Sequence, residues 1–150
     1  MKLYLVRHGE ALDKFIDSER PLSEKGQAAI KQLAINLGQR KVYVEWLWHS
    51  GIQRAEETAH LLVKQISNNA LCEIDEQLCP EEDPLDIAKK LNAKNDNGMI
   101  VGHLPHLGIL VAHLLRNCKT IPTINFSPGT IYCLKRENNK DWQFCWKLDP

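Results

Sequence analysis

Several features that mark specialised protein classes are missing from this chain of 150 residues. Its five cysteines lie far apart and include no Cys-x-x-Cys pair, which argues against a zinc site or a disulfide framework and favours a reducing compartment. No run of about 18 apolar residues is present, so no membrane span is expected. Because 19 Lys and Arg balance 19 Asp and Glu, neither nucleic acid nor an anionic membrane is expected as a partner.

The remaining composition is that of an ordinary globular protein. Hydrophobic residues make up 43% of the chain and charged residues 25%, and a chain of this length buries enough surface to hold a core without a metal or disulfide. The apolar start at residues 2–6 is too short for a signal sequence and runs directly into Arg7. We therefore predict one domain over residues 1–150, cytoplasmic and monomeric.

Hydrophobic periodicity predicts strands that alternate with helices. The expected strands cover residues 2–6, 42–48, 70–74, 99–101, 130–134 and 142–148. Two helices are expected to begin after the N-caps Ser23 and Ser50, the first ending at Gly38 and the second at residues 67–69. Two further helices are expected over residues 84–91 and 107–115. The last two strands are joined by a polar turn at residues 137–140. This order predicts an α/β fold with three layers, α/β/α, and a mostly parallel sheet that ends in an antiparallel hairpin.

Two arginines and two histidines are expected at one edge of this sheet, where the strands end. In such sheets ligands bind beyond the carboxyl ends of the strands. The loops that leave three of the predicted strands carry Arg7 and His8, Arg54, and His103. Two guanidinium groups oppose a bound cation and suit a phosphate dianion, and a neutral imidazole beside them can attack phosphorus in line. The pattern therefore predicts phosphoryl chemistry that needs neither a metal nor another cofactor.

Four sequence motifs carry a resemblance to a known family. Arg7-His8-Gly9 resembles the signature of the histidine phosphatase (phosphoglycerate mutase-like) superfamily. Residues 20–26, 50–59 and 101–105 are similar to three further motifs of that superfamily, and all four occur in the family order. The short carboxyl-terminal hairpin resembles that of the SixA-type phosphohistidine phosphatases. Gly51 departs from the family, which usually has proline there, and this leaves the rigidity of that turn open.

The resemblance implies a role for each matched residue. His8 would be the nucleophile that becomes phosphorylated, while Arg7, Arg54 and His103 would bind the phosphoryl group, and water would then hydrolyse the phosphoenzyme. Further candidates for substrate binding are Gly9, Ser50 and Arg20. The implied substrate is a phosphohistidine-carrying protein of the phosphorelay type, and the implied product is inorganic phosphate.

Two other functions stay open at this point. A phosphatase of small phosphomonoesters would need an acid to protonate an alkoxide, and the candidates are Glu76, Glu81, Glu82 and Asp83. A short, open site with no obvious acid favours phosphohistidine instead, because its imidazole leaves readily once protonated. A non-catalytic module that binds phosphorylated proteins would use Arg7 and Arg54 but has no need of a nucleophile.

The remaining conspicuous residues have simpler interpretations. Between residues 71 and 88 seven acids occur without a base, which indicates a solvated acidic loop or, alternatively, a docking site for a basic partner. His103 and His106 have a metal-like spacing, but no third ligand is evident. His106 is expected in the first turn of a helix. The four tryptophans are expected to pack in or around the sheet.

Overall fold

A computed structural model describes residues 1–67, 69–138 and 140–150. Within these residues one mixed sheet has the strand order β3-β2-β4-β1-β5-β6. The strands are β1 (Lys2–Arg7), β2 (Trp46–His49), β3 (Leu71–Ile74), β4 (Gly98–Gly102), β5 (Ile131–Lys135) and β6 (Gln143–Leu148). Strands β1 to β4 pair in parallel, whereas β5 pairs antiparallel with both β1 and β6. The predicted parallel sheet with a terminal antiparallel hairpin is confirmed.

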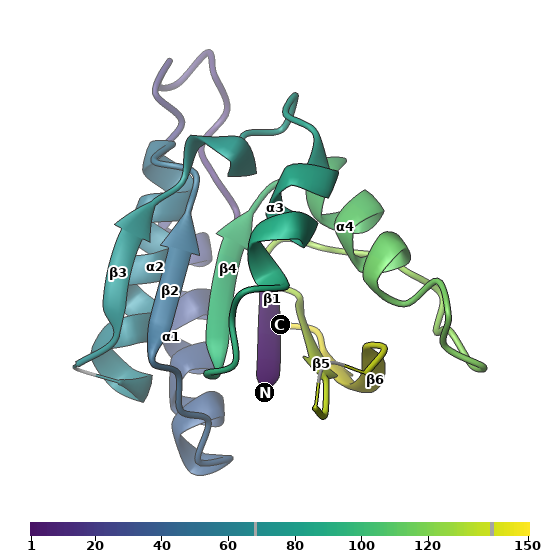
Figure 1. Cartoon of the computed structure of the whole chain (residues 1–150). Helices are drawn as coiled ribbons and strands as arrows, with labels where there is room; N and C mark the ends of the chain where they lie inside the picture. The colour runs from purple at the N-terminus through teal and green to yellow at the C-terminus, as the bar shows by residue number, and fades with distance from the viewer. Residues whose placement is uncertain (68, 139) are drawn as a thin grey trace.

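Helices cover both faces of the sheet (Figure 1). The helices are α1 (Glu24–Gln39), α2 (Gln53–Ile66), α3 (Pro84–Leu91) and α4 (His106–Leu114), with a short 3₁₀ turn at Glu76–Leu78. Side chains alternate along β1, so that Leu3 and Leu5 enter the core shared with α3 and α4. Tyr4 and Val6 enter the second core, with α1 and α2. The three-layer prediction is confirmed, and no helix of the described residues is long and apolar enough to cross a membrane.

The amino-terminal end of α1 is tied to the loop that follows the Arg-His-Gly motif. Ser23 Oγ accepts a hydrogen bond from the Gly26 amide at 3.0 Å, so the predicted N-cap is confirmed. The Ser23 amide donates to the Glu10 carbonyl at 2.9 Å. A Cβ at Gly26 would collide with that same carbonyl oxygen, so glycine permits the close approach.

Three predicted boundaries are wrong. Strand β2 begins at Trp46 rather than at residue 42, because the Val42 amide bonds to the Leu37 carbonyl at the end of α1 instead of joining the sheet ladder. Helix α1 continues past Gly38 to Gln39, and the residue with positive φ after it is Lys41, at 54°. The N-cap of α2 is Ile52, not Ser50. The turn predicted at residues 137–140 includes Asn139, and the end predicted for α2 includes Asn68, both outside the described residues.

Candidate active site

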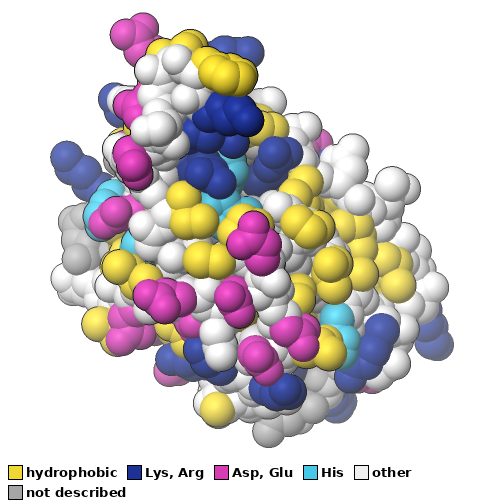
Figure 2. Space-filling model, turned by 90° about the horizontal axis from the view of Figure 1, so that it is seen from above, with side chains coloured by type: hydrophobic (Ala, Val, Ile, Leu, Met, Phe, Trp, Pro, Cys, Tyr) yellow, Lys and Arg dark blue, Asp and Glu magenta, His cyan; other side chains and the backbone are white. Residues whose placement is uncertain are grey.

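The carboxyl ends of three neighbouring strands bring the predicted site residues together. Arg7 ends β1 opposite Gly102 of β4, and His49 of β2 lies opposite Val101 of β4. The residues that follow these strand ends are His8, Ser50 and His103. Viewed from this end of the sheet, the molecule has histidines and basic side chains gathered in its upper central part (Figure 2).

The hydrogen bonds of His8 define which of its ring nitrogens is free. Its Nδ1 lies 2.7 Å from the Gly9 carbonyl oxygen, which can only accept, so Nδ1 carries the proton. Nε2 therefore keeps its lone pair, and the Nε–H of Arg54 donates to it at 3.3 Å. The side chain is nearly enclosed, with 8% of the residue exposed. The arrangement presents one unprotonated imidazole nitrogen beside a guanidinium group.

His103 faces His8 across the site. The two ring centroids are 5.0 Å apart, and His103 Nε2 lies 2.7 Å from the Ser50 hydroxyl. That hydroxyl also accepts from the Ile52 amide at 3.3 Å, so Ser50 joins His103 to the start of α2. Burial lowers the pKa of His103 to about 3, and the neighbouring His8 and Arg54 act in the same direction.

His8 is uncharged at neutral pH for the same reasons. Burial is the largest cause that lowers its pKa to about 4, followed by the positive charges of Arg54, Arg7 and Arg20, while the bond to Gly9 acts in the opposite direction. A neutral imidazole retains the lone pair that attack on phosphorus requires. The basic surroundings thus favour both an anionic ligand and an unprotonated nucleophile.

We expect NMR spectra to show His8 as the neutral Nδ1–H tautomer from about pH 8 to about pH 5.5. Its folded pKa of about 4 lies below the ordinary value of 6.5, so between these values the unfolded chain binds a proton that the folded chain does not. The contribution of His8 to folding stability is therefore present above pH 6.5 and is lost as the pH falls through 4. A ring titration with its midpoint near 6.5 would contradict this expectation.

Arg7 is oriented by the chain segment that precedes β5. Its Nη1 donates to the Phe126 carbonyl at 2.7 Å, and the Gly129 amide lies 3.1 Å from the carbonyls of both Arg7 and His8. Arg7 Nε is buried and has no hydrogen-bond partner among the described residues. Burial also lowers the pKa of this guanidinium. An unused, enclosed N–H group is a suitable donor for an anionic oxygen.

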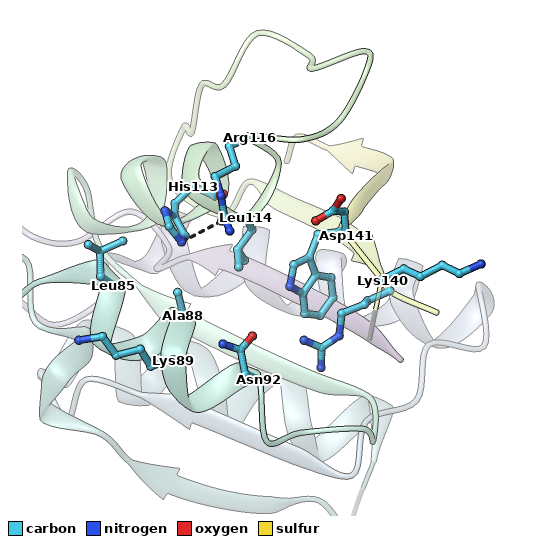
Figure 3. Close-up of a pocket in the computed structure, with 11 residues that line it drawn as sticks. Leu85, Ala88, Lys89, Asn92, His113, Leu114, Arg116, Lys140 and Asp141 are labelled. Atoms are coloured by element: carbon cyan, nitrogen blue, oxygen red, sulfur yellow. Dashed lines mark hydrogen bonds between the residues drawn. The ribbon is translucent and has the colours of Figure 1, made fainter. Parts of the chain in front are cut away.

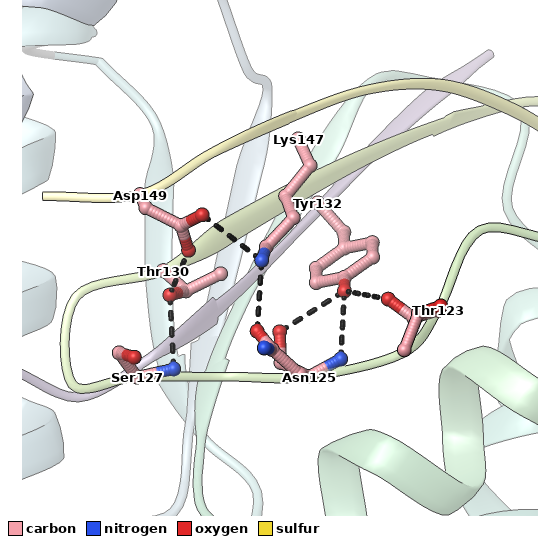
Figure 4. Close-up of polar contacts among 7 residues, drawn as sticks. All are labelled: Thr123, Asn125, Ser127, Thr130, Tyr132, Lys147 and Asp149. Carbon is pink, nitrogen blue, oxygen red and sulfur yellow. Dashed lines mark hydrogen bonds and ion pairs between the residues drawn. The ribbon is translucent and has the colours of Figure 1, made fainter.

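A polar network fixes the segment that carries the Phe126 carbonyl (Figure 4). The Tyr132 hydroxyl accepts from the Asn125 amide at 2.9 Å. Thr130 Oγ1 accepts from the Ser127 amide at 3.0 Å and donates to Asp149 at 2.7 Å. The network anchors the segment on both sides of Phe126, so the position of Arg7 depends on residues far away in the sequence.

Thr58 was not identified from the sequence as a functional residue. Its hydroxyl accepts from the Gly9 amide at 3.0 Å and donates to the Arg54 carbonyl at 2.7 Å. Thr58 therefore joins the Arg-His-Gly loop to the first turn of α2. One feature of the sequence could have identified it: Thr58 follows Arg54 by four residues in the same motif, and this spacing places both side chains on one face of the helix.

The structure brings Arg7, His8, Arg54 and His103 together, as predicted. Arg20 lies exposed at the edge of the site, where its charge helps to lower the pKa of both His8 and Arg54. The amide of Gly9 is used by Thr58, so it is not free to bind a substrate.

The turn around Gly51 differs from a turn built on proline. Gly51 has a φ of 80°, which proline cannot adopt. Its amide donates to His49 Nδ1 at 3.2 Å, and this bond adds to the one between Ser50 and Ile52. Hydrogen bonds thus hold this turn where the family's proline is absent.

The acidic stretch lies against the Ser50 side of the site. Cys79 Sγ is 3.8 Å from the Ser50 carbonyl oxygen. Burial raises the pKa of the Cys79 thiol, and so do the charges of Glu82, Glu76 and Glu81. His106 begins α4, as predicted, and is fully buried. Trp46 and Trp48 are also buried, with ring centroids 4.4 Å apart, which confirms their expected packing role.

A separate hollow of about 280 Å³ lies between α3, the end of α4 and the start of β6 (Figure 3). Lys89, Arg116 and Lys140 contribute to its lining. The Arg136 side chain in its wall donates to the carbonyls of Leu91 and Lys94 at 3.1 and 2.7 Å, and this ties β5 to the end of α3. The hollow contains none of the predicted site residues.

Comparison with known proteins identifies the family of this chain. The family description "Histidine phosphatase superfamily (branch 1)" matches residues 3–80. The chain therefore belongs to the histidine phosphatase superfamily, and its fold is phosphoglycerate mutase-like. It is 28% identical to the phosphohistidine phosphatase SixA of Escherichia coli (strain K12), over 100% of this chain and 94% of that protein.

Solved structures extend the likeness. The structure of the protein histidine phosphatase SixA complexed with tungstate matches with a TM-score of 0.86 at 27% identity, over 99% of this chain and 96% of that one. A phosphoglycerate mutase from Plasmodium falciparum matches with a TM-score of 0.72 at 17% identity, over 97% and 88% of the two chains. The second likeness concerns the fold alone.

Proposed function

We propose that this protein removes the phosphoryl group from phosphohistidine on a partner protein through a covalent phospho-His8 intermediate. The observation that carries the proposal is the unprotonated Nε2 of His8, which lies 3.3 Å from the Arg54 Nε in a setting that keeps the ring neutral. Similarity to SixA over the whole chain supports phosphatase activity. The roles of the individual residues follow from their chemistry.

In the first step His8 Nε2 attacks phosphorus and forms a new P–N bond. The P–N bond to the partner's histidine breaks at the same time, and its electron pair returns to that ring nitrogen. The partner's imidazole leaves as a neutral ring because its other nitrogen already carries a proton taken from solvent. Arg7, Arg54 and His103 surround the phosphoryl oxygens as negative charge accumulates on them. The Gly9 carbonyl accepts from Nδ1–H throughout, and it stabilises the positive charge that phosphorylation gives the His8 ring.

In the second step water attacks the phosphorus of phospho-His8. The P–N bond breaks, its electron pair returns to Nε2, and inorganic phosphate leaves. The sum of the two steps is the hydrolysis of phosphohistidine to histidine and phosphate. Neither step requires an electron transfer or a metal-bound nucleophile.

The leaving group favours phosphohistidine over a phosphomonoester. An alkoxide needs an acid in line with the breaking bond, whereas imidazole needs only a protonated ring nitrogen. Glu76, Glu81 and Glu82 act on the pKa of the Cys79 thiol and are exposed, and no carboxylate is among the charges that shift the pKa of His8. Small phosphomonoesters remain the second candidate, with Glu76, Glu81 or Glu82 as the acid.

A phosphate-release assay in the presence of a chelator distinguishes the two substrates. We expect phosphohistidine protein to be hydrolysed faster than every member of a panel of sugar and nucleotide phosphates, with no loss of rate on addition of EDTA. Alanine variants of Glu76, Glu81 and Glu82 are expected to keep the wild-type rate on a small phosphoramidate. Faster release from a phosphomonoester, together with inactivation by one of these substitutions, would favour the second candidate.

A further inference from the structure

Two large apolar side chains are held in solvent beside the site. Phe15 is 88% exposed and Ile16 is 73% exposed. Both amides bond to Asp13, Phe15 to its carboxylate at 2.9 Å and Ile16 to its carbonyl at 2.9 Å. The base of the loop is closed by the Leu12 amide, which donates to the Pro21 carbonyl at 2.8 Å. The hydrogen bonds within the loop leave both side chains exposed, with Lys14 Nζ 5.3 Å from the Phe15 ring centroid, and two adjacent large apolar side chains in solvent are candidates for a contact site.

The loop stands at the mouth of the site. It rises beyond the carboxyl ends of the strands (Figure 1), and the Leu22 amide at its end bonds to Glu57 of α2 at 2.7 Å. Arg20, in the same loop, is close enough for its charge to act on both His8 and Arg54. A group that delivers a phosphoryl to His8 therefore passes close to this loop.

The loop forms one part of the rim around the site, and a second, acidic part of this rim lies on the Ser50 side of the site. Glu76, Glu81 and Glu82 are exposed, and none of them forms an ion pair within the described chain. The neighbouring Asp75 and Asp86, by contrast, pair with Lys90 and Lys89 at 2.6 and 2.8 Å. The contact from Cys79 to Ser50 connects this part to the site floor. In Figure 2 acidic side chains gather below the basic centre, and the projecting part above it carries hydrophobic side chains together with further acidic ones.

We propose that Phe15 and Ile16, together with Glu76, Glu81 and Glu82, form a two-part docking surface for the phosphohistidine-bearing segment of a partner protein. The segment would carry apolar side chains on one side of its phosphohistidine and basic ones on the other. Unpaired carboxylates complement basic residues, while the arginines below receive the phosphoryl group. This proposal rests on the proposed function, because it assumes that the group delivered to His8 belongs to a protein.

Three synthetic peptides of equal length, each with one central phosphohistidine, test the surface. One has lysine and leucine flanks, one glutamate and leucine flanks, and one lysine and serine flanks. Binding to the His8→Ala protein, measured by fluorescence anisotropy, is expected to be tightest for the lysine–leucine peptide, by about tenfold over each of the others. The advantage of lysine over glutamate is expected to shrink as salt is added.

Substitutions in the two parts of the rim test which part recognises the lysine flank and which part recognises the leucine flank. E81Q/E82Q is expected to abolish the advantage of lysine flanks, and F15S/I16S the advantage of leucine flanks. Glu137 and Ile121 are exposed residues outside the rim, and Glu137 follows β5 at the opposite end of the sheet. The matched controls E137Q and I121S are expected to keep both preferences. Equal binding of the three peptides, or unchanged preferences in the rim variants, would overturn the docking surface.

A second assay uses the protein with His8 intact and measures hydrolysis of phosphoramidate and of the same peptides. It distinguishes a failure of the docking proposal from a failure of the proposed function. Rim variants are expected to hydrolyse phosphoramidate at the wild-type rate and the lysine–leucine peptide more slowly. A loss of rate on phosphoramidate equal to that on the peptide would assign these residues to chemistry and overturn docking. If the three peptides bind with the expected ranking of affinities but no substrate releases phosphate, the proposed function alone would be overturned.

Discussion

Replacing His8 by alanine is expected to abolish turnover and phosphoenzyme formation together. In the described structure the unprotonated nitrogen of His8 lies beside a guanidinium donor, whereas His103 Nε2 lies against the Ser50 hydroxyl. Removal of a nucleophile that acts as a unit with its neighbours costs roughly 10⁴-fold or more in rate. Phosphate release and transfer of radioactive label from phosphohistidine protein to the enzyme measure the two losses.

The chemistry of the label provides a separate check. Phosphohistidine is labile to acid and stable to base, so the label on the wild-type protein is expected to disappear in acid only. His60→Ala, which alters an exposed histidine of α2, is expected to retain both label and turnover. Turnover that persists in the His8→Ala protein would exclude the covalent mechanism.

Replacing Arg54 by alanine is expected to slow phosphorylation of His8 by roughly tenfold to a few hundredfold, the effect of losing one charge-assisted contact of about 1.5–3 kcal/mol. Arg54 donates to His8 Nε2 in the free protein, and a phosphoryl group placed at that nitrogen would meet the same guanidinium. Its charge also helps to keep the pKa of His8 low, so the variant is expected to raise that pKa. Rapid-quench measurement of label transfer gives the rate directly.

Arg54→Lys distinguishes the shape of the guanidinium from its charge. A lysine supplies a point charge but no planar fork, so we expect it to restore only part of the lost rate. Arg116→Ala, which removes an exposed cation after α4, is expected to have no effect. Full recovery by lysine would show that charge alone is required, and a wild-type rate in the alanine variant would remove Arg54 from the mechanism.

Much of the site was predictable because its residues occur in short segments next to strand ends. A buried run that stops at Arg7-His8-Gly9 defines both a strand and the loop after it, and the same holds for His103 after β4. Parallel strands place their carboxyl ends on one edge, so the convergence of these loops followed from topology alone. The boundaries that failed, at residues 42–45 and at Gly38, depend on bonds between the end of α1 and the chain after it.

Other features of the site were not predictable in this way. Thr58 accepts from the Gly9 amide, and the Phe126 carbonyl accepts from Arg7, yet neither of these two contacts leaves a periodic pattern in the sequence. Ser50 was expected to cap a helix, and its hydroxyl instead contacts His103 as well as the Ile52 amide. The contacts of Gly9 with Thr58, of Arg7 with Phe126 and of Ser50 with His103 join residues 49, 119 and 53 positions apart, and they depend on how strands and loops pack.

The sequence by itself determined the α/β alternation, the four side chains of the site and the edge of the sheet at which they meet, because these depend on periodicity and on the positions of strand ends. Only the tertiary structure decided that His8 Nε2 is the free nitrogen, that both imidazoles are neutral, and that an apolar tip and unpaired carboxylates flank the site. The physical reason is that protonation and exposure depend on burial and on partners contributed by distant segments, which no local pattern encodes.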